Sequence, residues 1–246
     1  MTATAAILLA AGKGTRMRST LPKVLHPFRG EPLLLHPLRA VRRAGATLVV
    51  VVVGHGAQAV EQAVRAHGRD GDPELRFAVQ AEQRGTGHAV LCALSCMDDV
   101  QGPVLVCSGD VPLVTPERLQ ALVDGCLASG TVALGVFTPA DPSGYGRIVR
   151  DPAGHVQAIR EHRDADAREL AIRECNAGLY CFDAAVLRET LPRVGSNNVQ
   201  GEIYLTDVIA ALAGRGLATV AIPEHEAAGI NTPEELSALE AIALGR

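Results

Sequence analysis

Six consecutive apolar residues at 48–53 (LVVVVV) constrain the fold more than any other stretch of this chain. Most of them are β-branched, and the run ends at Gly54-His55-Gly56, so it predicts a strand. A strand without a polar side is typical of a parallel sheet that helices cover on both faces. Aromatic residues make up only 3% of the 246 residues, so Val, Leu, Ile and Ala must build the core. We therefore expect an α/β fold.

The same alternation of segments runs through the first half of the chain. Apolar runs predict strands at 5–10, 48–53, 75–80, 104–107 and 132–138. Helices are predicted at 32–44, 57–66, 87–95 and 116–128. Pro37 would kink the first helix or delay its start, and Thr115 is the expected N-cap of the last. This alternation implies right-handed crossovers and an open, doubly wound, mostly parallel, Rossmann-like sheet, whose ligands bind outside the carboxyl ends of the strands.

The pattern changes from residue 139 onward. Short strands are predicted at 147–150, 155–159 and 175–182. A turn at 151–154 joins the first two, which indicates a small antiparallel extension that forms one wall of a cleft. Further elements are predicted as helices at 183–191, 204–212 and 233–244 and a strand at 219–222, with Thr232 as the cap of the final helix. No internal repeat is visible, and in particular no hexapeptide periodicity.

Charge and cysteine usage exclude several classes of protein. The net charge of −4 argues against a nucleic-acid-binding protein and against binding to an anionic membrane. The six cysteines lack C-x-x-C spacing, which disfavours a zinc site or a disulfide framework. No stretch approaches the length of a membrane span. We expect reduced thiols and a cytoplasmic location.

The first predicted strand breaks abruptly into glycines and cations, and such a loop suits a phosphate. Gly12 and Gly14 lack a Cβ, so the backbone can take left-handed angles and bring N–H groups close to an anion. Arg16 and Lys23 add donors that suit oligophosphate oxygens. The dinucleotide fingerprint does not fit, because Met17 stands where its third glycine belongs, and the ATPase loop does not fit either.

The loop string LAAGKGTRM at 9–17, followed by LPKVLH at 21–26, closely resembles the signature of sugar-1-phosphate nucleotidyltransferases. It is most similar to the uridyltransferase half of the bifunctional N-acetylglucosamine-1-phosphate uridyltransferase/glucosamine-1-phosphate acetyltransferase family. The resemblance implies a GT-A-like nucleotidyltransferase fold and uridylyl transfer from UTP to N-acetylglucosamine-1-phosphate, a step toward cell-wall precursors. It also implies that Arg16 and Lys23 are catalytic cations. The nucleotide-binding residues in this loop would be Leu9, Ala10, Ala11, Gly12 and Gly14.

Asp110 is the strongest candidate for a metal ligand. It follows a buried strand in a tight Ser-Gly-Asp-Val-Pro turn, where a carboxylate can hold Mg²⁺ while nucleotide phosphates and waters complete the shell. By itself, such an aspartate could equally be an ordinary capping residue. The resembling family supplies a second ligand from an asparagine, which matches Asn231 here.

The segments 80–83 and 85–89 together match the family's base-reading segment, with a difference at Arg84. The Gln80 amide offers a donor and an acceptor, which suits the edge of uracil, and Gly85 and Thr86 can present backbone groups to it. Outside this context Gln80 would be a surface residue at a strand end. His88 could be considered as a general base, but its place in the first turn of a predicted helix favours a structural role.

The acceptor side resembles the family at four short segments, 144–147, 161–162, 176–178 and 201–207. The matching residues would contact the sugar hydroxyls and the N-acetyl group, with Tyr204 lining the pocket; they are Gly146, Glu161, Asn176, Tyr204 and Thr206. Three neighbouring positions differ from the usual residues: Ala177 replaces a threonine, Arg163 a lysine and Ile203 an aromatic residue. These differences concern the identity of the acceptor and not the type of reaction.

The resemblance also divides the chain into regions. Residues 1–228 would form the nucleotidyltransferase domain, with a nucleotide-binding part at 1–138 and a sugar-phosphate-binding part at 139–228, and residues 229–246 would carry the metal-ligand turn and the final helix. The left-handed β-helix of the acetyltransferase half is expected to be absent. In the family that half builds most of the trimer, so the resemblance implies no oligomeric state for this chain alone.

Three alternatives stay open. The first is the same chemistry with another pair of substrates, such as dTTP with glucose-1-phosphate. The second is a nucleotide-sugar sensor or regulatory subunit that binds without turnover, and the intact Arg16, Lys23, Asp110 and Asn231 argue against it. The third is a dehydrogenase, which the missing third glycine disfavours.

Overall fold

The computed structural model describes residues 4–68 and 71–245, and among them nine strands form one sheet. Seven strands follow one another across it, in the order β11 (Leu217–Ala221), β7 (Val132–Phe137), β10 (Cys175–Asp183), β6 (Pro103–Ser108), β1 (Thr4–Leu9), β4 (Ala46–Val53) and β5 (Glu74–Val79). The strands β6, β1, β4 and β5 are mutually parallel, and β11 is parallel to β7. The predicted mostly parallel α/β sheet is confirmed.

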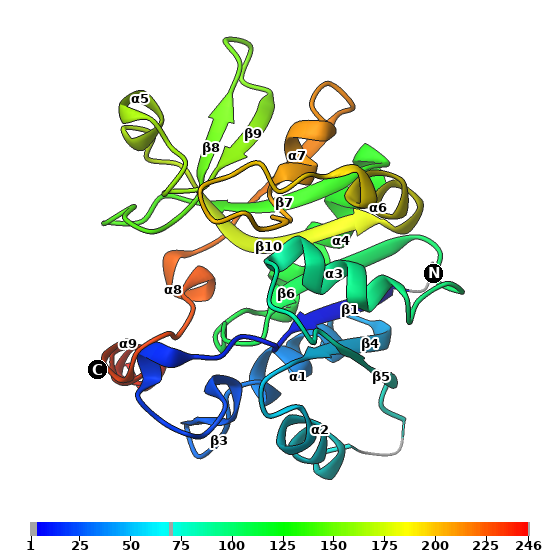
Figure 1. Cartoon of the computed structure of the whole chain (residues 1–246), viewed down its shortest axis with the longest axis vertical. Helices are drawn as coiled ribbons and strands as arrows, with labels where there is room; N and C mark the ends of the chain where they lie inside the picture. The colour runs from blue at the N-terminus through cyan, green and yellow to red at the C-terminus, as the bar shows by residue number, and fades with distance from the viewer. Residues whose placement is uncertain (1–3, 69–70, 246) are drawn as a thin grey trace.

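Helices cover both faces of the sheet, as Figure 1 shows. The first face carries α1 (Leu35–Arg43), α2 (Ala57–Ala66) and α4 (Pro116–Ser129), and the second carries α3 (Thr86–Leu94), α6 (Ala184–Thr190) and α7 (Asp207–Ala211). In β4 the side chains at 49, 51 and 53 belong to the first core, and those at 48, 50 and 52 belong to the second. A strand with apolar residues at every position is therefore buried on both sides, as the sequence predicts.

The strand β10 differs from its predicted place. Residues 175–182 were expected in the antiparallel extension, yet β10 lies between β6 and β7 in the central sheet and runs antiparallel to both. The reason is burial on two faces, because Leu179 and Cys181 enter one core while Tyr180 and Phe182 enter the other. Only Cys175 pairs with the extension, which consists of β8 (Arg147–Arg150) and β9 (Val156–Arg160).

The N-terminal segment forms a small third core with the end of the chain. Two short 3-10 turns, η1 (Thr15–Met17) and η2 (Lys23–Leu25), precede a hairpin of β2 (Pro27–Phe28) and β3 (Glu31–Pro32), and the sequence reasoning predicted none of these. The two-residue loop of this hairpin has positive φ at both positions, 52° at Arg29 and 82° at Gly30, as a type I′ turn requires. The helix α9 (Pro233–Ala243) packs on this segment through Leu239, which contacts a cluster that includes Met17 and Phe28.

The first residues of α9 and α4 show whether the predicted N-caps, Thr232 and Thr115, form capping hydrogen bonds. Thr232 caps α9 as expected, since its Oγ1 accepts the N–H of Glu235 at 3.2 Å in a full capping box. Thr115 is the N-cap residue of α4, but its side chain does not cap the helix. Its hydroxyl donates instead to Oε2 of buried Glu226 at 2.6 Å. Glu226 lies in α8 (Glu224–Ala227), a four-residue helix that the sequence did not predict.

The remaining elements depart little from prediction. The helix α1 starts at Leu35, because Pro37 then falls in the first turn, where its missing N–H is not needed. The helix α7 is shorter than the predicted 204–212. Two short elements were not predicted, α5 (Ala167–Leu170) and η3 (Leu191–Arg193). Within the described ranges, every helix is too short or too polar to cross a lipid bilayer.

Candidate functional site

Two cavities lie outside the carboxyl ends of the parallel strands, where a doubly wound sheet binds its ligands. The first has a volume of about 270 Å³, and its lining includes Leu9, Ala10, Ala11, Gly12, Lys23, Gln80, Gln83, Gly85 and Thr86. The second has a volume of about 860 Å³, and its lining includes Arg16, Tyr145, Gly146, Glu161, Asn176, Glu224, Asn231 and Glu235. Ser108 and Asp110, at the end of β6, line both cavities. Most of the candidate nucleotide and acceptor residues therefore face two cavities that meet at Asp110, whereas Gly14, Tyr204 and Thr206 line neither of them.

The glycine loop connects β1 to η1, and its two glycines serve different purposes. Gly14 is left-handed, with φ of 61°, and a Cβ there would meet Cβ of Lys23 at 2.5 Å. Gly12 is not among the residues with positive φ, so the expected left-handed angle is wrong there. A Cβ on Gly12 would meet nothing within 4 Å, and Gly12 lines the first cavity. Gly14 is thus required by the fold of the chain itself, whereas Gly12 leaves space beside the cavity.

Lys23 joins the two candidate metal ligands. Its ammonium group donates to Oδ2 of Asp110 and, at 3.1 Å, to Oδ1 of Asn231. The turn that carries Asn231 is also tied to the end of β6, because the N–H of Ile230 donates to the backbone oxygen of Asp110 at 3.0 Å. Oδ2 of Asp110 and Oδ1 of Asn231 therefore face the same point, and the Lys23 ammonium group occupies it.

The same point has the ligands of a divalent-ion site. Asp110 and Asn231 offer a carboxylate oxygen and an amide oxygen, which are the hard ligands that Mg²⁺ prefers. No group of three or more His, Cys, Asp and Glu side chains that could hold a metal occurs within residues 4–68 and 71–245. An ion here would need further ligands from substrate phosphates and water, as Mg²⁺ sites commonly do. The donor set fits such an ion once the Lys23 ammonium, which lies between the same two oxygens, moves away from them.

Gln80 lies at the end of β5 and is buried, with 5% of its surface exposed. Its Nε2 donates to the backbone oxygen of Gly85 at 3.0 Å and lies 3.2 Å from Nδ1 of His88. No donor from the described part of the chain reaches its Oε1. The amide therefore offers the cavity an acceptor, rather than the donor and acceptor that the sequence suggested.

The segment around Gly85 is shaped by the loop at 201–205. Gly85 has φ of 98°, and a Cβ there would meet the backbone oxygen of Ile203 at 2.5 Å. Oγ1 of Thr86 accepts the N–H of Leu205 at 3.1 Å. Gln83, which the sequence reasoning did not select although it falls in the matching string, donates to the backbone oxygen of Ala11 at 2.6 Å. It thereby ties the candidate base segment to the glycine loop.

On the acceptor side, Gly146, Glu161 and Asn176 line the second cavity. Burial raises the pKa of the Glu161 carboxyl, although a hydrogen bond of 2.9 Å from the Thr206 hydroxyl opposes that shift. The side chain of Asn176 is bonded within its own strand, to the Tyr180 hydroxyl at 2.6 Å and to the N–H of Gly178 at 3.0 Å.

Tyr204 and Thr206 are both buried, and neither lines the cavity, contrary to the expectation for Tyr204. The Tyr204 hydroxyl donates to Oε1 of Gln200 at 3.0 Å. Desolvation, followed by the nearby carboxylate of Asp164, raises the pKa of Tyr204 to about 12. Thr206 reaches the cavity only through Glu161, to which it donates. These two residues therefore support the wall from behind.

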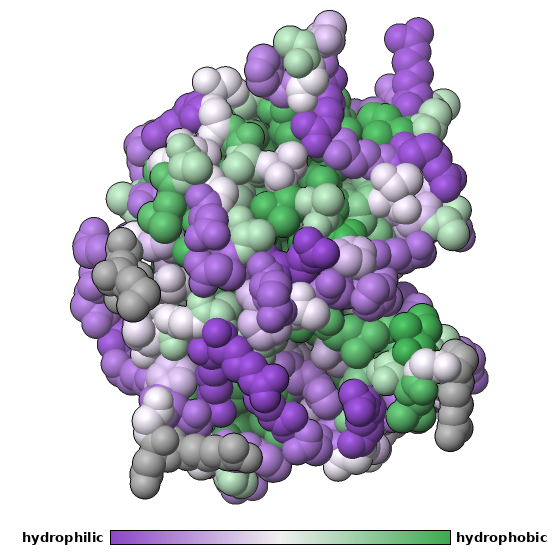
Figure 2. Space-filling model, turned by 180° about the vertical axis from the view of Figure 1, so that it is seen from behind, coloured by the Kyte–Doolittle hydropathy of each residue, from purple (hydrophilic) through white to green (hydrophobic). Residues whose placement is uncertain are grey.

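Several lining residues of the second cavity were not predicted. The ring of Tyr145 packs edge-on against Phe137, with the centroids 4.9 Å apart. Tyr145 stood in the matched string at 144–147, so this signal was available. Glu224 lies in α8, and a helix of four residues is too short to be recognised from the spacing of its apolar residues. At the edge where α9 lies, Figure 2 shows a gathering of apolar side chains, and Ile242, which lines this cavity, is 52% exposed.

Comparisons with known proteins identify the family of this chain. Residues 6–177 match the family described as the MobA-like NTP transferase domain. A protein named bifunctional protein GlmU from Anaeromyxobacter sp. (strain Fw109-5) is 51% identical over 243 residues, which cover 98% of this chain and 49% of that protein. A protein of the same name from Cellvibrio japonicus (strain Ueda107) is 47% identical over 239 residues, covering 95% of this chain and 51% of that protein. The chain thus spans about half the length of these relatives.

A solved structure supports the fold. The crystal structure of UDP-glucose pyrophosphorylase complexed with UDP-glucose aligns over 100% of both chains with a TM-score of 0.78. Its sequence is only 18% identical, so the likeness concerns the fold alone.

Proposed function

Since the chain belongs to the MobA-like NTP transferase family, we propose that it transfers the uridylyl group of UTP to N-acetylglucosamine-1-phosphate, giving UDP-N-acetylglucosamine and pyrophosphate. The family membership confirms the nucleotidyltransferase resemblance drawn from the glycine loop. The observation that carries the proposal is the meeting of the two cavities at Asp110, with Lys23 and Asn231 beside it. A triphosphate in the first cavity would then face a sugar phosphate in the second.

The first cavity suits a uracil base. The N3–H of uracil is a donor, and the free Oε1 of Gln80 is an acceptor. The backbone at Gly85 and Thr86 borders the same cavity. The triphosphate would follow the residues from Leu9 to Gly14, with its oxygens in the open space beside Gly12. Lys23, which lines the first cavity, and Arg16, which lines the second, would approach the leaving pyrophosphate from different sides and neutralise the charge that develops on it.

The reaction needs no side-chain nucleophile. An oxygen of the sugar phosphate is already anionic at neutral pH and attacks the α-phosphorus in line, while the bond from that phosphorus to the oxygen bridging it to the β-phosphate breaks. The chain's task is to position the two phosphates and to offset their repulsion. A Mg²⁺ ion held by Asp110 and Asn231 would supply positive charge at the α-phosphate.

The second cavity would hold the sugar. Glu161 and the backbone of Gly146 would bind its hydroxyls, and Thr206 would orient the Glu161 carboxylate. Asn176 would contribute its remaining amide proton, and Tyr204 would support the wall. This arrangement assigns nucleotide binding to 1–138, sugar-phosphate binding to 139–228 and the second metal ligand to 229–246. All six cysteines are unpaired, which supports a reducing compartment such as the cytoplasm.

The test is pyrophosphate release across a matrix of UTP, dTTP and CTP with N-acetylglucosamine-1-phosphate and glucose-1-phosphate. UTP with the N-acetylated sugar should give the highest kcat/KM. Arg16→Ala should lower kcat about a hundredfold or more, because it removes one electrostatic donor from the reacting phosphates. Arg18→Ala is the matched control, since Arg18 is exposed, lies two residues away and lines neither cavity.

Three results would contradict the proposal in different ways. Near-normal turnover in both Arg16→Ala and Asp110→Asn would overturn the mechanism. A strong preference for another pair of substrates would correct the substrate and keep the reaction. Tight nucleotide binding without any Mg²⁺-dependent product would favour a sensor.

A further inference from the structure

We infer that His88 fixes the amide of Gln80 so that the first cavity receives its carbonyl oxygen and not its N–H group, which makes His88 a positioning residue for nucleotide selectivity. The inference rests on the proposed function, because it assumes that a pyrimidine base occupies this cavity. His88 lies in the first turn of α3 and does not line the cavity. His88 therefore affects a ligand in the first cavity only through its contact with Gln80.

The side chain of Gln80 has two hydrogen-bond partners, and both of them contact its Nε2. The backbone oxygen of Gly85 lies at 3.0 Å, and Nδ1 of His88 lies at 3.2 Å. A backbone oxygen only accepts hydrogen bonds, so the atom facing Gly85 must be the nitrogen of the amide. With Nε2 bound on this side, Oε1 is the polar atom that Gln80 has left for a ligand.

Nδ1 of His88 is the acceptor in this contact because the amide Nε2 of Gln80 can only donate, and the surroundings of the other ring nitrogen are compatible with that. Nε2 of His88 lies 3.9 Å from Sγ of Cys92, one turn later in α3. Burial raises the pKa of Cys92, so its sulfur remains a thiol that can accept a weak hydrogen bond. With the ring proton on Nε2, His88 can donate weakly to the sulfur of Cys92. Its Nδ1 then has a free lone pair that accepts the N–H of the Gln80 amide.

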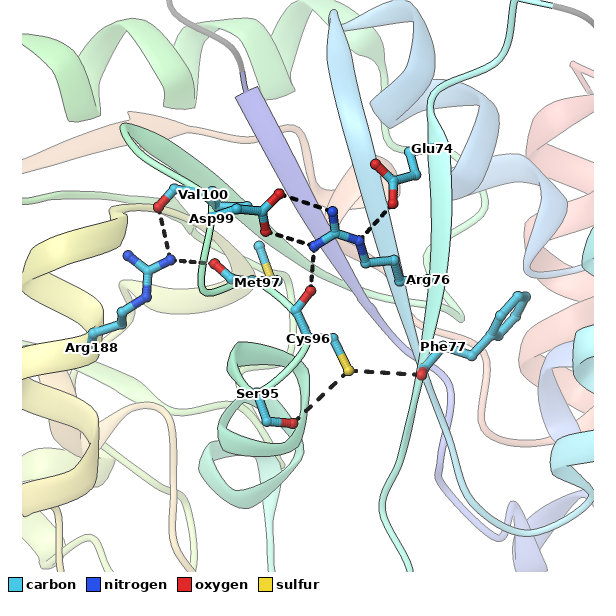
Figure 3. Close-up of polar contacts among 9 residues, drawn as sticks. All are labelled: Glu74, Arg76, Phe77, Ser95, Cys96, Met97, Asp99, Val100 and Arg188. Carbon is cyan, nitrogen blue, oxygen red and sulfur yellow. Dashed lines mark hydrogen bonds and ion pairs between the residues drawn. The ribbon is translucent and has the colours of Figure 1, made fainter.

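The helix α3 and the strand β5 are held together at their other ends, which keeps His88 and Gln80 in register. Figure 3 shows that Arg76, on β5, donates to the backbone oxygen of Cys96 at 2.6 Å and binds both carboxylate oxygens of Asp99 at 2.7 and 3.0 Å. Sγ of Cys96 also lies 3.9 Å from the backbone oxygen of Phe77. The segment just after α3 is thereby fixed to the strand that delivers Gln80.

The orientation of this amide separates two classes of pyrimidine. Uracil presents N3–H, a donor, and pairs with Oε1 of Gln80. Cytosine presents an unprotonated N3, an acceptor, and would place two acceptors against each other. If the amide turned over, Oε1 would face Gly85 O and Nδ1 of His88, which are both acceptors. Each partner therefore opposes the orientation that would admit cytosine.

The test compares His88→Leu with His88→Asn in the full chain. Leucine removes the acceptor, whereas Oδ1 of asparagine can stand near the position of Nδ1 and keep it. Two ratios are measured for UTP and CTP: kcat/KM, and Kd by calorimetry without sugar phosphate. In His88→Leu the preference for UTP should fall about 2- to 12-fold, the equilibrium equivalent of one net hydrogen bond, because Gly85 still holds the amide. His88→Asn should stay within about twofold of the wild type.

A third variant and the choice of readout keep the test decisive. His88→Gln carries its amide about one bond further out, toward the place of Nε2, so it should lose selectivity as the leucine variant does while remaining polar. A loss of general stability would change both nucleotides alike and leave the ratio unmoved. The inference is overturned if His88→Leu and His88→Gln keep the wild-type ratio, or if His88→Asn loses as much as they do. If the wild type turns over neither nucleotide, the proposed function fails, and the ratio of Kd values still decides the role of His88.

Discussion

Replacing Gly14 with alanine should destabilise the protein and displace Lys23. Gly14 has φ of 61°, and an L-residue held in the left-handed region costs about 1–2 kcal/mol. The new Cβ would also lie 2.5 Å from Cβ of Lys23, far inside van der Waals contact. The partner atom is next to the backbone and cannot swing away, so overpacking adds about 1–3 kcal/mol. The expected total loss in the free energy of unfolding is therefore about 2–5 kcal/mol.

Two other glycines separate these two contributions. Gly130 ends α4 with φ of 68°, and a Cβ there meets nothing within 4 Å, so Gly130→Ala reports the left-handed strain alone. Gly12→Ala has neither a positive φ nor a close neighbour and should change stability by less than about 0.5 kcal/mol. Urea unfolding followed by circular dichroism measures all three variants. In turnover assays Gly14→Ala should also lower kcat, because the clash displaces Lys23, one of the two cations proposed to offset the charge on the leaving pyrophosphate. Equal losses of stability at Gly14 and Gly130 would refute the clash with Lys23, and a large loss at Gly12 would refute the loop geometry.

Two further predictions concern carboxylates at the site, the half-buried Glu161 and the buried Glu226. Burial raises the pKa of Glu161 above its ordinary 4.5, so the native state holds a proton more tightly than the unfolded chain and wild-type stability falls as the pH rises above about 4.5. Glu161→Gln lacks this penalty, and urea unfolding from pH 4 to 7 should show it gaining stability relative to the wild type as the pH rises; a difference independent of pH would contradict the burial argument. At the start of α4, Thr115→Val should cost about 1–3 kcal/mol, because it removes a hydrogen bond to the Glu226 carboxylate, and Thr115→Ser should cost less than about 1. Thr115→Asp distinguishes this contact from helix capping, since aspartate is a good cap but would oppose Glu226, and a neutral effect would refute the assignment.

The parallel part of the sheet could be predicted because its signal is local. A run such as 48–53 has no polar position, so its burial on both faces follows from the sequence alone. The helix at 57–66 was predicted with its observed bounds for a similar reason, as glycine and apolar spacing mark it. The place of β10 could not be predicted in this way, because 37 residues separate it from β7 and 66 residues separate it from β6 in the sequence. Its insertion between β6 and β7 depends on packing against two helical layers that no short window of sequence contains.

The candidate site shows the same division. Glycines, cations and a strand-end carboxylate mark the phosphate loop and Asp110, since each residue type has a chemical property that the loop requires. The hydrogen bonds of Gln80 could not be read from residue types, because they depend on where Gly85 and His88 lie after folding. Tyr204 and Thr206 match the family's pattern, yet they stand behind the wall of the cavity. Motif matching selected residues that the fold gathers around two adjoining cavities, and only packing separates residues that face a cavity from residues that stand behind its wall.

The position of Lys23 decides which cation gives a clean test of catalysis. Asp110 is 7% exposed, and a carboxylate buried to that extent is costly without a nearby positive charge. Lys23 supplies that charge from 87 residues away in the sequence. A Lys23→Ala variant would therefore leave an unpaired buried charge, which typically costs 3–5 kcal/mol, and lost activity could reflect lost folding. Arg16 is exposed and lines the second cavity, so removing its charge should change turnover while stability stays near that of the wild type. Turnover of Arg16→Ala measures phosphate chemistry, whereas that of Lys23→Ala mixes the chemistry with the integrity of the site.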